Sequence, residues 1–264
     1  MHHDSTSSSL RRVWVIAGMA LTEARRNRLP WIVLAMAAVV LASSLFARSL
    51  ALTESARLQV ALLASFARVA AAFVVCLHVI GSALREQQDR ITDYLLSVDL
   101  PRGVYLAGKA AGYMMVALAV AIVFWMPVAA YAPGVPVFAW LLSLVLELWI
   151  VAASAVFCAV TLNHFLLGTA FVMGLYVLSR TMSSLVLIAT ASPFLTTDAT
   201  QQALAAVLRG IALLLPDLER FSRSGWLAGS PPDAAVLLSI SLEAMTYIVL
   251  LLAAALVDLY RKNL

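Results

Sequence analysis

The sequence contains few charged residues, and this scarcity is the first restriction on its structure. Only 12% of its 264 residues are Asp, Glu, Lys or Arg, whereas 63% are hydrophobic. Soluble domains carry about 25% charged and about 45–50% apolar residues. One core of this size cannot hide so much apolar surface, so the composition predicts that lipid is the solvent. An ordinary soluble domain is therefore excluded.

Cysteine is almost absent, and so are recognisable catalytic arrangements. Cys76 and Cys158 lie inside apolar runs at no metal-binding spacing, so we expect neither a disulfide framework nor a metal site. No Ser/His/Asp or paired-carboxylate pattern indicates a hydrolase, and we expect no enzymatic activity and no cofactor bound by the chain itself. The net charge of +4 arises from basic residues at the ends of apolar runs. That placement indicates membrane orientation rather than a nucleic-acid partner.

Long apolar runs are what the sequence has in abundance. A helix that crosses a bilayer needs about 20 apolar residues. Six runs meet this requirement: Leu29–Phe46, Leu58–Leu84, Val104–Tyr131, Val137–Leu162, Phe165–Ala191 and Ala234–Tyr260. We expect an all-α membrane protein whose residues 1–264 form a single transmembrane domain with six transmembrane helices.

The basic residues predict the orientation of these spans. The side with both termini holds Arg11, Arg12, Arg25, Arg26, Arg28, Arg85, Arg90, Arg102, Lys109, Arg261 and Lys262, and the other holds Arg48, Arg57, Arg209, Arg220 and Arg223. Lys and Arg accumulate on the cytoplasmic side of membrane proteins. We therefore expect a multi-pass protein of the plasma membrane, here a bacterial inner membrane, with both termini in the cytoplasm.

Residues 9–28 form a separate element before the first span. Apolar residues recur there at helical spacing, at Leu10, Val13, Trp14, Ala17, Leu21 and Ala24. This pattern predicts an amphipathic interfacial helix on the cytoplasmic membrane surface. Its candidate contact residues are Arg11, Arg12, Trp14, Arg25 and Arg26. The alternative is a frayed basic leader that only sets the topology.

The segment Gly103–Lys109 matches the phosphate-binding pattern GxxxxGK. A phosphate-binding loop follows a strand and has Ser or Thr after its lysine to hold Mg²⁺. Here Ala110 follows Lys109, and the apolar residues continue directly into a predicted span. We therefore expect no nucleotide site here, and Lys109 is interpreted as an anchor at the cytoplasmic interface.

Residues 85–103 form the densest charged stretch of the chain, between spans two and three. Apolar Ile91, Tyr94, Leu95 and Leu96 recur within it at helical spacing. This combination predicts a short amphipathic helix that docks on a cytoplasmic partner. The candidate interface residues are Glu86, Asp89, Arg90, Asp93, Tyr94 and Arg102. The alternative is a helix packed only on its own bundle.

Four charged residues fall inside predicted spans, at Arg68, Glu147, Arg180 and Glu243. At 1.5 Å per residue they lie roughly 10–18 Å from the outer ends of their spans. Ionisable side chains are costly in lipid and indicate function by default. Two interpretations stay open, a structural network of buried ion pairs and the polar lining of an outward-facing path.

Residues 193–232 form the largest predicted extramembrane segment, which we expect to face outward. Gln201–Leu215 within it is apolar enough for a short helix or a re-entrant hairpin. We therefore expect an extracytoplasmic hairpin-like segment with short helices between spans five and six.

The stretch from Glu86 to Lys109 resembles the signature of ABC-2-type permeases, the membrane subunits of one class of ATP-binding-cassette transporters. Glu86, Leu95-Leu96, Pro101-Arg102 and Gly108-Lys109 match that signature in order and approximate spacing, whereas Arg90-Ile91 replaces its usual Gly-Thr. Leu215–Phe221 is similar to a Pro-acidic-Phe patch in the branch related to copper-enzyme maturation permeases.

This resemblance implies a permease subunit, an exporter without a nucleotide site of its own. Its partners would be two copies of a cytoplasmic ABC ATPase, which bind ATP and Mg²⁺, and a second copy of the permease. The loop after span two and the N-terminal helix would contact the ATPase. The alternative function is a self-contained ion-coupled carrier or a membrane-embedded enzyme.

Overall fold

The computed structural model describes residues 4–50, 55–89, 101–132, 134–191, 206–208, 210–211, 215–221 and 233–261. Every named element in this part of the chain is a helix. The helices are α1 (Asp4–Arg26), α2 (Leu29–Leu50), α3 (Ser55–Gln88), α5 (Arg102–Tyr131), α6 (Val135–Leu162), α7 (Phe165–Ala191), α9 (Leu218–Phe221) and α11 (Ala234–Arg261).

Six of these helices are long and apolar enough to cross a membrane: α2, α3, α5, α6, α7 and α11. The predicted all-helical fold with six candidate spans is therefore confirmed. The bounds of α7 equal the predicted ones, whereas α3 continues to Gln88, beyond the predicted end at Leu84. The charged residues Arg85 and Glu86 consequently belong to the last turns of α3 rather than to a loop.

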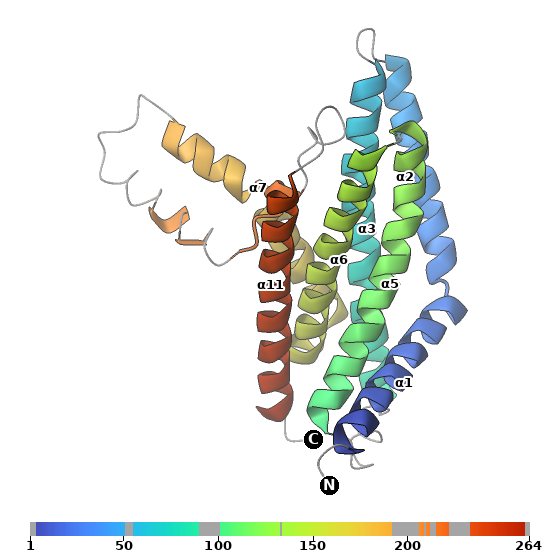
Figure 1. Ribbon diagram of the computed structural model, residues 1–264, viewed down its shortest axis with the longest axis vertical. Helices are drawn as coiled ribbons and strands as arrows, with labels where there is room; N and C mark the ends of the chain where they lie inside the picture. Colours follow the sequence, from blue (N-terminus) through green and yellow to red (C-terminus); the bar gives the residue numbers. More distant parts are fainter. Residues whose placement is uncertain are drawn as a thin grey trace.

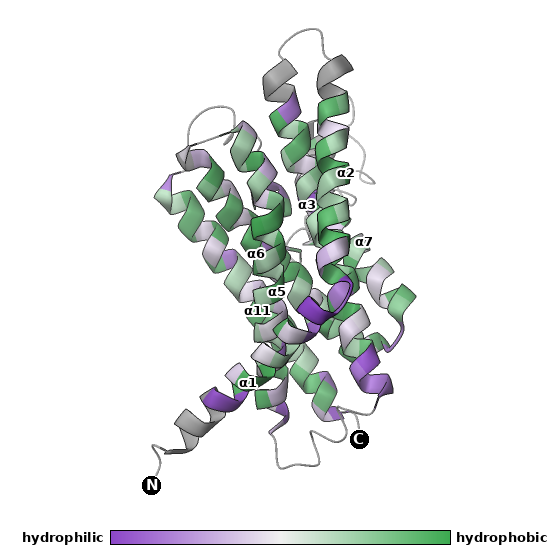
Figure 2. Ribbon diagram, turned by 90° about the vertical axis from the view of Figure 1, so that its right-hand side faces the viewer, coloured by the Kyte–Doolittle hydropathy of each residue, from purple (hydrophilic) through white to green (hydrophobic). Residues whose placement is uncertain are grey.

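The long helices run side by side, and both ends of the chain lie at one end of the bundle (Figure 1). We call that end, which holds α1 and the last turn of α11, the basal end, and the opposite end the distal end. The hydropathy colouring of Figure 2 shows hydrophobic residues along the long helices and hydrophilic ones on α1 near the N-terminus. Large apolar side chains are exposed on the outer surface, for example Trp31 and Leu166 at 76% and 80%. Such a surface fits a transmembrane protein, because lipid tails can cover it.

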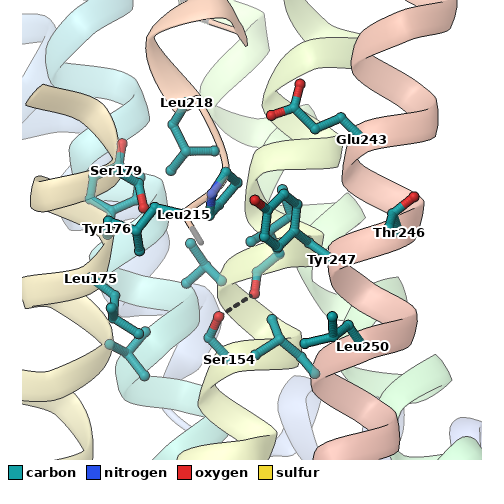
Figure 3. Close-up of a pocket in the computed structure, with 15 residues that line it drawn as sticks. Ser154, Leu175, Tyr176, Ser179, Leu215, Leu218, Glu243, Thr246, Tyr247 and Leu250 are labelled. Carbon is teal, nitrogen blue, oxygen red and sulfur yellow. Dashed lines mark hydrogen bonds between the residues drawn. The ribbon is translucent and has the colours of Figure 1, made fainter. Parts of the chain in front are cut away.

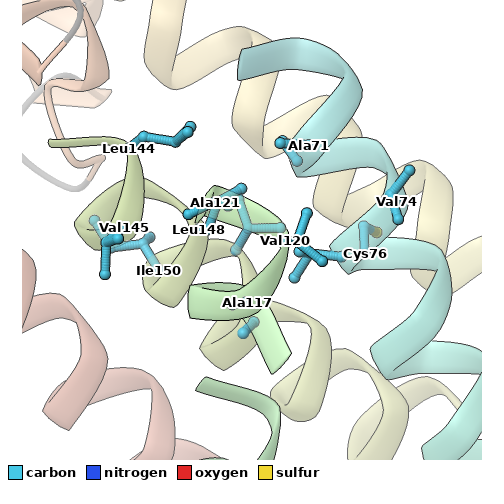
Figure 4. Packing of buried hydrophobic residues seen from close by; sticks show 14 of the residues in the cluster. Ala71, Val74, Cys76, Ala117, Val120, Ala121, Leu144, Val145, Leu148 and Ile150 are labelled. Carbon is cyan, nitrogen blue, oxygen red and sulfur yellow. The ribbon is translucent and has the colours of Figure 1, made fainter. Parts of the chain in front are cut away.

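Helix α6 is the most enclosed of the six, with α3, α5, α7 and α11 packed around it. The core between α3, α5 and α6 combines small and branched residues (Figure 4). Ala71, Ala117 and Ala121 are fully buried there beside Leu144 and Leu148. Alanines let helix backbones approach closely, which is how helices gain packing energy within a bilayer. This core holds in place the buried polar residues described below.

Helix α1 packs along α5 at the basal end, through Ile16, Ala17 and Ala20. A Cβ atom at Gly112 would lie 2.6 Å from the Cβ of Ala20, and one at Gly108 would lie 2.8 Å from that of Ile16. Both α5 positions therefore require glycine. The helix begins at Asp4, earlier than the predicted residue 9, and its placement on a membrane surface stays a prediction.

Two predicted segments lie largely outside the described residues. Of the coupling segment 85–103, the structure describes 85–89 and 101–103. Of the hairpin-like segment 193–232, it describes 206–208, 210–211 and 215–221. Within the latter, only the single turn of α9 and the residues before it contribute to the sites below.

Candidate functional site

A cluster of charged side chains is buried between α3, α6 and α7. The carboxylate of Glu147 forms an ion pair with Nη1 of Arg68 through its Oε2 atom. Its Oε1 atom lies 3.2 Å from Nη1 of Arg180. The side chains of Arg68 and Glu147 are 2% and 0% exposed, and that of Arg180 is 21% exposed. Two cations around one carboxylate leave this cluster, which we call the buried charge cluster, with one excess positive charge.

Neutral partners complete the cluster. Tyr176 donates a hydrogen bond of 2.8 Å from its hydroxyl to Oε1 of Glu147. Nη2 of Arg68 donates a hydrogen bond of 2.7 Å to the hydroxyl of Ser143. The guanidinium of Arg68 lies 4.9 Å from the centre of the Trp140 ring. Buried ions are tolerated only when such additional hydrogen bonds satisfy them. The cluster therefore joins three helices and lowers the cost of burying these charges.

Glu243, the fourth predicted intramembrane charge, lies elsewhere. Its Oε1 atom accepts a 3.0 Å hydrogen bond from the backbone N–H of Asp217, and its Oε2 atom lies 3.8 Å from Nη1 of Arg220. The structure thus brings together three of the four residues and gives Glu243 a separate role, in holding the segment before α9.

Residues 215–221 cross the distal part of the bundle between α7 and α11, and we call them the distal plug. The hydroxyl of Ser183 on α7 donates a hydrogen bond of 2.6 Å to Oδ1 of Asp217. The hydroxyl of Ser184 donates a hydrogen bond of 3.1 Å to Oε2 of Glu219. Leu218 and Phe221 are 1% and 0% exposed. The segment singled out for its Pro-acidic-Phe pattern is thus tied to both neighbouring helices and inserts its apolar residues between them.

Below the distal plug lies a cavity of about 520 Å³ bounded by α6, α7 and α11, which we call the distal cavity (Figure 3). Its walls are mainly apolar, with hydroxyl groups from Ser154, Ser179, Thr246 and Tyr247. Tyr176 lines this cavity and also donates to Glu147. One side chain therefore connects the cavity directly with the buried charge cluster.

At the basal end, α1 and the adjoining ends of α3 and α5 enclose a groove of about 1430 Å³, which we call the basal groove. Its charged lining residues are of both signs: Arg11, Arg12, Arg26, Arg85, Lys109, Glu23, Glu86 and Asp89. The groove also has apolar lining residues, Val15, Ile16 and Met19. Such a mixture suits a polypeptide partner that supplies complementary charges and an apolar anchor.

Glu86 lies in this groove but already has partners within the chain. It forms an ion pair with Nζ of Lys109, and the hydroxyl of Tyr105 donates to it over 3.3 Å. Glu86 is 8% exposed. It therefore joins α3 to α5, whereas Asp89 and Arg85 are exposed at the same helix end.

A second polar contact ties α1 to the same helices. The hydroxyl of Ser82 on α3 donates a hydrogen bond of 2.8 Å to Oε1 of Glu23 on α1. It also accepts a hydrogen bond of 3.3 Å from the hydroxyl of Tyr113 on α5. Together with the close approach at Gly108 and Gly112, this contact makes α1 an integral part of the basal end.

The other predicted interface residues are distributed as follows. Arg102 donates a hydrogen bond of 2.8 Å to the carbonyl oxygen of Leu259, and its guanidinium carbon lies 5.7 Å from the centre of the Tyr260 ring. It therefore joins α5 to α11. Arg11, Arg12 and Arg26 line the basal groove, whereas Trp14 and Arg25 are exposed outside it. Arg90, Asp93 and Tyr94 lie outside the described residues.

Sequence reasoning missed several residues of these sites. Tyr176 precedes Arg180 by four residues, the spacing at which helical side chains meet, so its hydroxyl was a detectable partner for that charge. Gly108 and Gly112 form the small-xxx-small pattern of closely packed membrane helices. This pattern predicts a close helix contact, but Gly108 also belongs to the GxxxxGK match, which points to phosphate binding instead. No pattern indicated the contact of Glu23 with Ser82.

No protein-family model matches the chain, and no curated protein matches it.

Proposed function

We propose that this chain is the membrane-spanning subunit of an ATP-driven exporter, powered by a separate cytoplasmic ATPase that docks in the basal groove. The observation that carries the proposal is the basal groove, whose charged walls come from the three helices that the Glu23, Ser82 and Glu86 contacts hold together. In this proposal the basal end faces the cytoplasm of a bacterial cell.

Helix α3 is the element that would transmit the ATPase's movement. It carries Glu86 at the basal groove and Arg68 in the buried charge cluster. These residues are 18 positions apart, which corresponds to about 27 Å along a helix. A rigid helix with fixed contacts at both ends passes a displacement at one end to the other. The movement would then reach Glu147 and, through Tyr176, the wall of the distal cavity.

The distal cavity is the proposed substrate path, and the distal plug its outer closure. ATP binding to the partner would favour one of two conformations of the bundle, which is the differential binding that a two-state shift requires. Two copies of the chain would pair in the membrane, as in the ABC-2-type permeases that its basal sequence resembles. ATP and Mg²⁺ would bind to the partner alone.

The first test is whether a P-loop ATPase co-purifies with the chain, and the second is reconstitution of the chain with that ATPase. We expect the chain to stimulate ATP hydrolysis in proteoliposomes. The double charge reversal R11E with R12E should abolish that stimulation, because both residues line the basal groove. Reversal of Arg261, which is exposed at the basal end outside this groove, is the matched control.

The alternative function is a self-contained ion-coupled carrier, and the buried charge cluster beside a cavity favours it. Glu147 touches the cavity wall through Tyr176, so a bound ion or proton there would affect the cavity. Transport in proteoliposomes that contain this chain alone, without ATP, would support the carrier and exclude the ATPase-driven subunit.

A further inference from the structure

A second hollow at the basal end lies between the start of α2, the last turns of α3 and the turn that joins α6 to α7. Its volume is about 730 Å³, and we call it the basal pocket. Polar residues on its lining include Asn27, Arg28, His78, Arg85, Asn163 and His164. No Asp or Glu is among the described residues that line it.

The basal pocket carries positive charge without a matching carboxylate. Arg28 and Arg85 are exposed, and within the described part of the chain neither forms an ion pair. Arg85 lines both the pocket and the basal groove, and the carboxylates at this end are on the groove side, where Glu86 pairs with Lys109 and Glu23 accepts a hydrogen bond from Ser82. The pocket is therefore electrostatically complementary to an anion.

His78 forms part of the inner wall of the pocket. It is 7% exposed, and its Nε2 atom has no hydrogen-bond partner among the described residues. The ring meets that of Tyr113 edge to face, with 6.4 Å between centroids. A buried polar atom without a hydrogen-bond partner destabilises the fold that holds it. The wall of the pocket therefore contains a buried polar ring whose hydrogen-bonding capacity is not fully used.

The remaining lining is apolar and continues onto the lipid-facing surface. Ile32 and Phe165 line the pocket and are 47% and 44% exposed. Trp31 and Leu166, their neighbours in the chain, are more exposed still. The site thus offers cations and imidazoles at one end and an exposed apolar surface at the other, which matches an amphiphile with an anionic head.

We propose that the basal pocket binds the phosphate headgroup of an anionic phospholipid from the leaflet at the basal end. Arginine binds phosphate oxygens through two parallel N–H groups, and Arg28 and Arg85 provide two such side chains. Basic pockets between transmembrane helices are a recurrent way to hold anionic lipid headgroups. The acyl chains extend over Ile32 and Phe165. The inference depends on the membrane-spanning architecture and not on the ATPase partner.

The test measures lipid retention by native mass spectrometry of the full-length protein purified in a neutral detergent. Phosphatidylglycerol and phosphatidylcholine with identical acyl chains are added in parallel. The unmodified chain should retain phosphatidylglycerol preferentially. The variant R28Q with R85Q should lose about fivefold in retention for each arginine. R28K with R85K should lose less than the glutamine variant, because lysine keeps the charge but not the two parallel N–H groups of arginine.

Matched controls show whether the retained lipid depends on the arginines of the basal pocket or on basic charge at the basal end in general. R261Q removes one basal-end charge outside the pocket and should retain phosphatidylglycerol like the unmodified chain. Equal retention of both lipids, or an equal loss in R261Q and in the double variant, would overturn the inference. Displacement of phosphatidylglycerol by an equal concentration of inorganic phosphate would also overturn it, because the site would then hold a soluble anion. None of these outcomes depends on transport activity.

Discussion

Arg68 and Glu147 form a buried ion pair across the interface of α3 and α6, although 78 residues separate them in the chain. Arg180 approaches the same carboxylate from α7. The carboxylate is therefore the only negative group among the described residues of the buried charge cluster that balances these cations. The stability of the membrane bundle should depend strongly on it.

Removing the charge of Glu147 tests this dependence. E147Q leaves Arg68 fully buried without a counter-charge, and breaking such a pair costs about 3–5 kcal/mol. We expect a marked loss of thermal stability in detergent, measured by the unfolding of the purified chain. The double variant R68M with E147L should be less destabilised than the two single changes added together, because it removes both buried ions.

E243Q is the matched control for that experiment. Glu243 is 22% exposed, its ion pair with Arg220 spans 3.8 Å, and an amide oxygen can still accept from the N–H of Asp217. Loss of this ion pair should lower the free energy of unfolding by about 0–1 kcal/mol. Equal destabilisation by E147Q and E243Q would contradict the distinction between the buried charge cluster and the distal plug.

The packing of α1 on α5 predicts that G112A separates these helices. The new Cβ would lie 2.6 Å from Cβ of Ala20 and 3.1 Å from the backbone of Ala17, and a backbone contact cannot relax by rotating a side chain. We expect faster cleavage by trypsin at Arg25 and Arg26 of the variant, followed by mass spectrometry of the fragments. G103A on the same helix has nothing within 4 Å of its new Cβ and should be cleaved like the unmodified chain.

The distal cavity predicts where a bulky side chain blocks transport. T246W fills part of the cavity from α11, so export should fall by at least about tenfold while binding of the ATPase persists. T181W changes an exposed threonine of α7 that is not among the cavity's lining residues. Undiminished export by T246W would show that substrate does not pass through this cavity.

The orientation of the bundle is tested by labelling with a membrane-impermeant maleimide. Y131C lies at the distal end and should react in intact cells, whereas R261C at the basal end should react only after the membrane is opened. The native thiols of Cys76 and Cys158 are buried and provide a low background. Labelling of R261C in intact cells would reverse the proposed topology.

The transmembrane helices could be predicted from the sequence, because length and hydropathy are local properties. The run Phe165–Ala191 has the same bounds in the structure as in the prediction. The end of α3 was harder to predict, since Arg85 and Glu86 look like the start of a loop but continue the helix. Glu86 is stabilised there by a partner on another helix, Lys109, which no local pattern reveals.

The arrangement of the polar residues was less predictable, for a related reason. Sequence reasoning estimates how deep a residue lies in the membrane but not towards which neighbour it points. Glu147 and Glu243 therefore look alike in the sequence, although Glu147 binds two arginines in the core and Glu243 binds a backbone amide and the exposed Arg220. In the same way, Gly108 matches part of a phosphate-binding pattern, whereas the structure uses it, together with Gly112, for helix packing.

The excess positive charge around Glu147 has an electrical consequence. A charge held within the hydrocarbon layer experiences the membrane voltage, which is worth about 2.3 kcal/mol per elementary charge for every 100 mV crossed. Any conformational change that moves Arg68 and Arg180 along the membrane normal therefore performs work against that field. In the proposed ATP-driven exporter, the balance between the two conformations would then depend on the membrane voltage as well as on ATP.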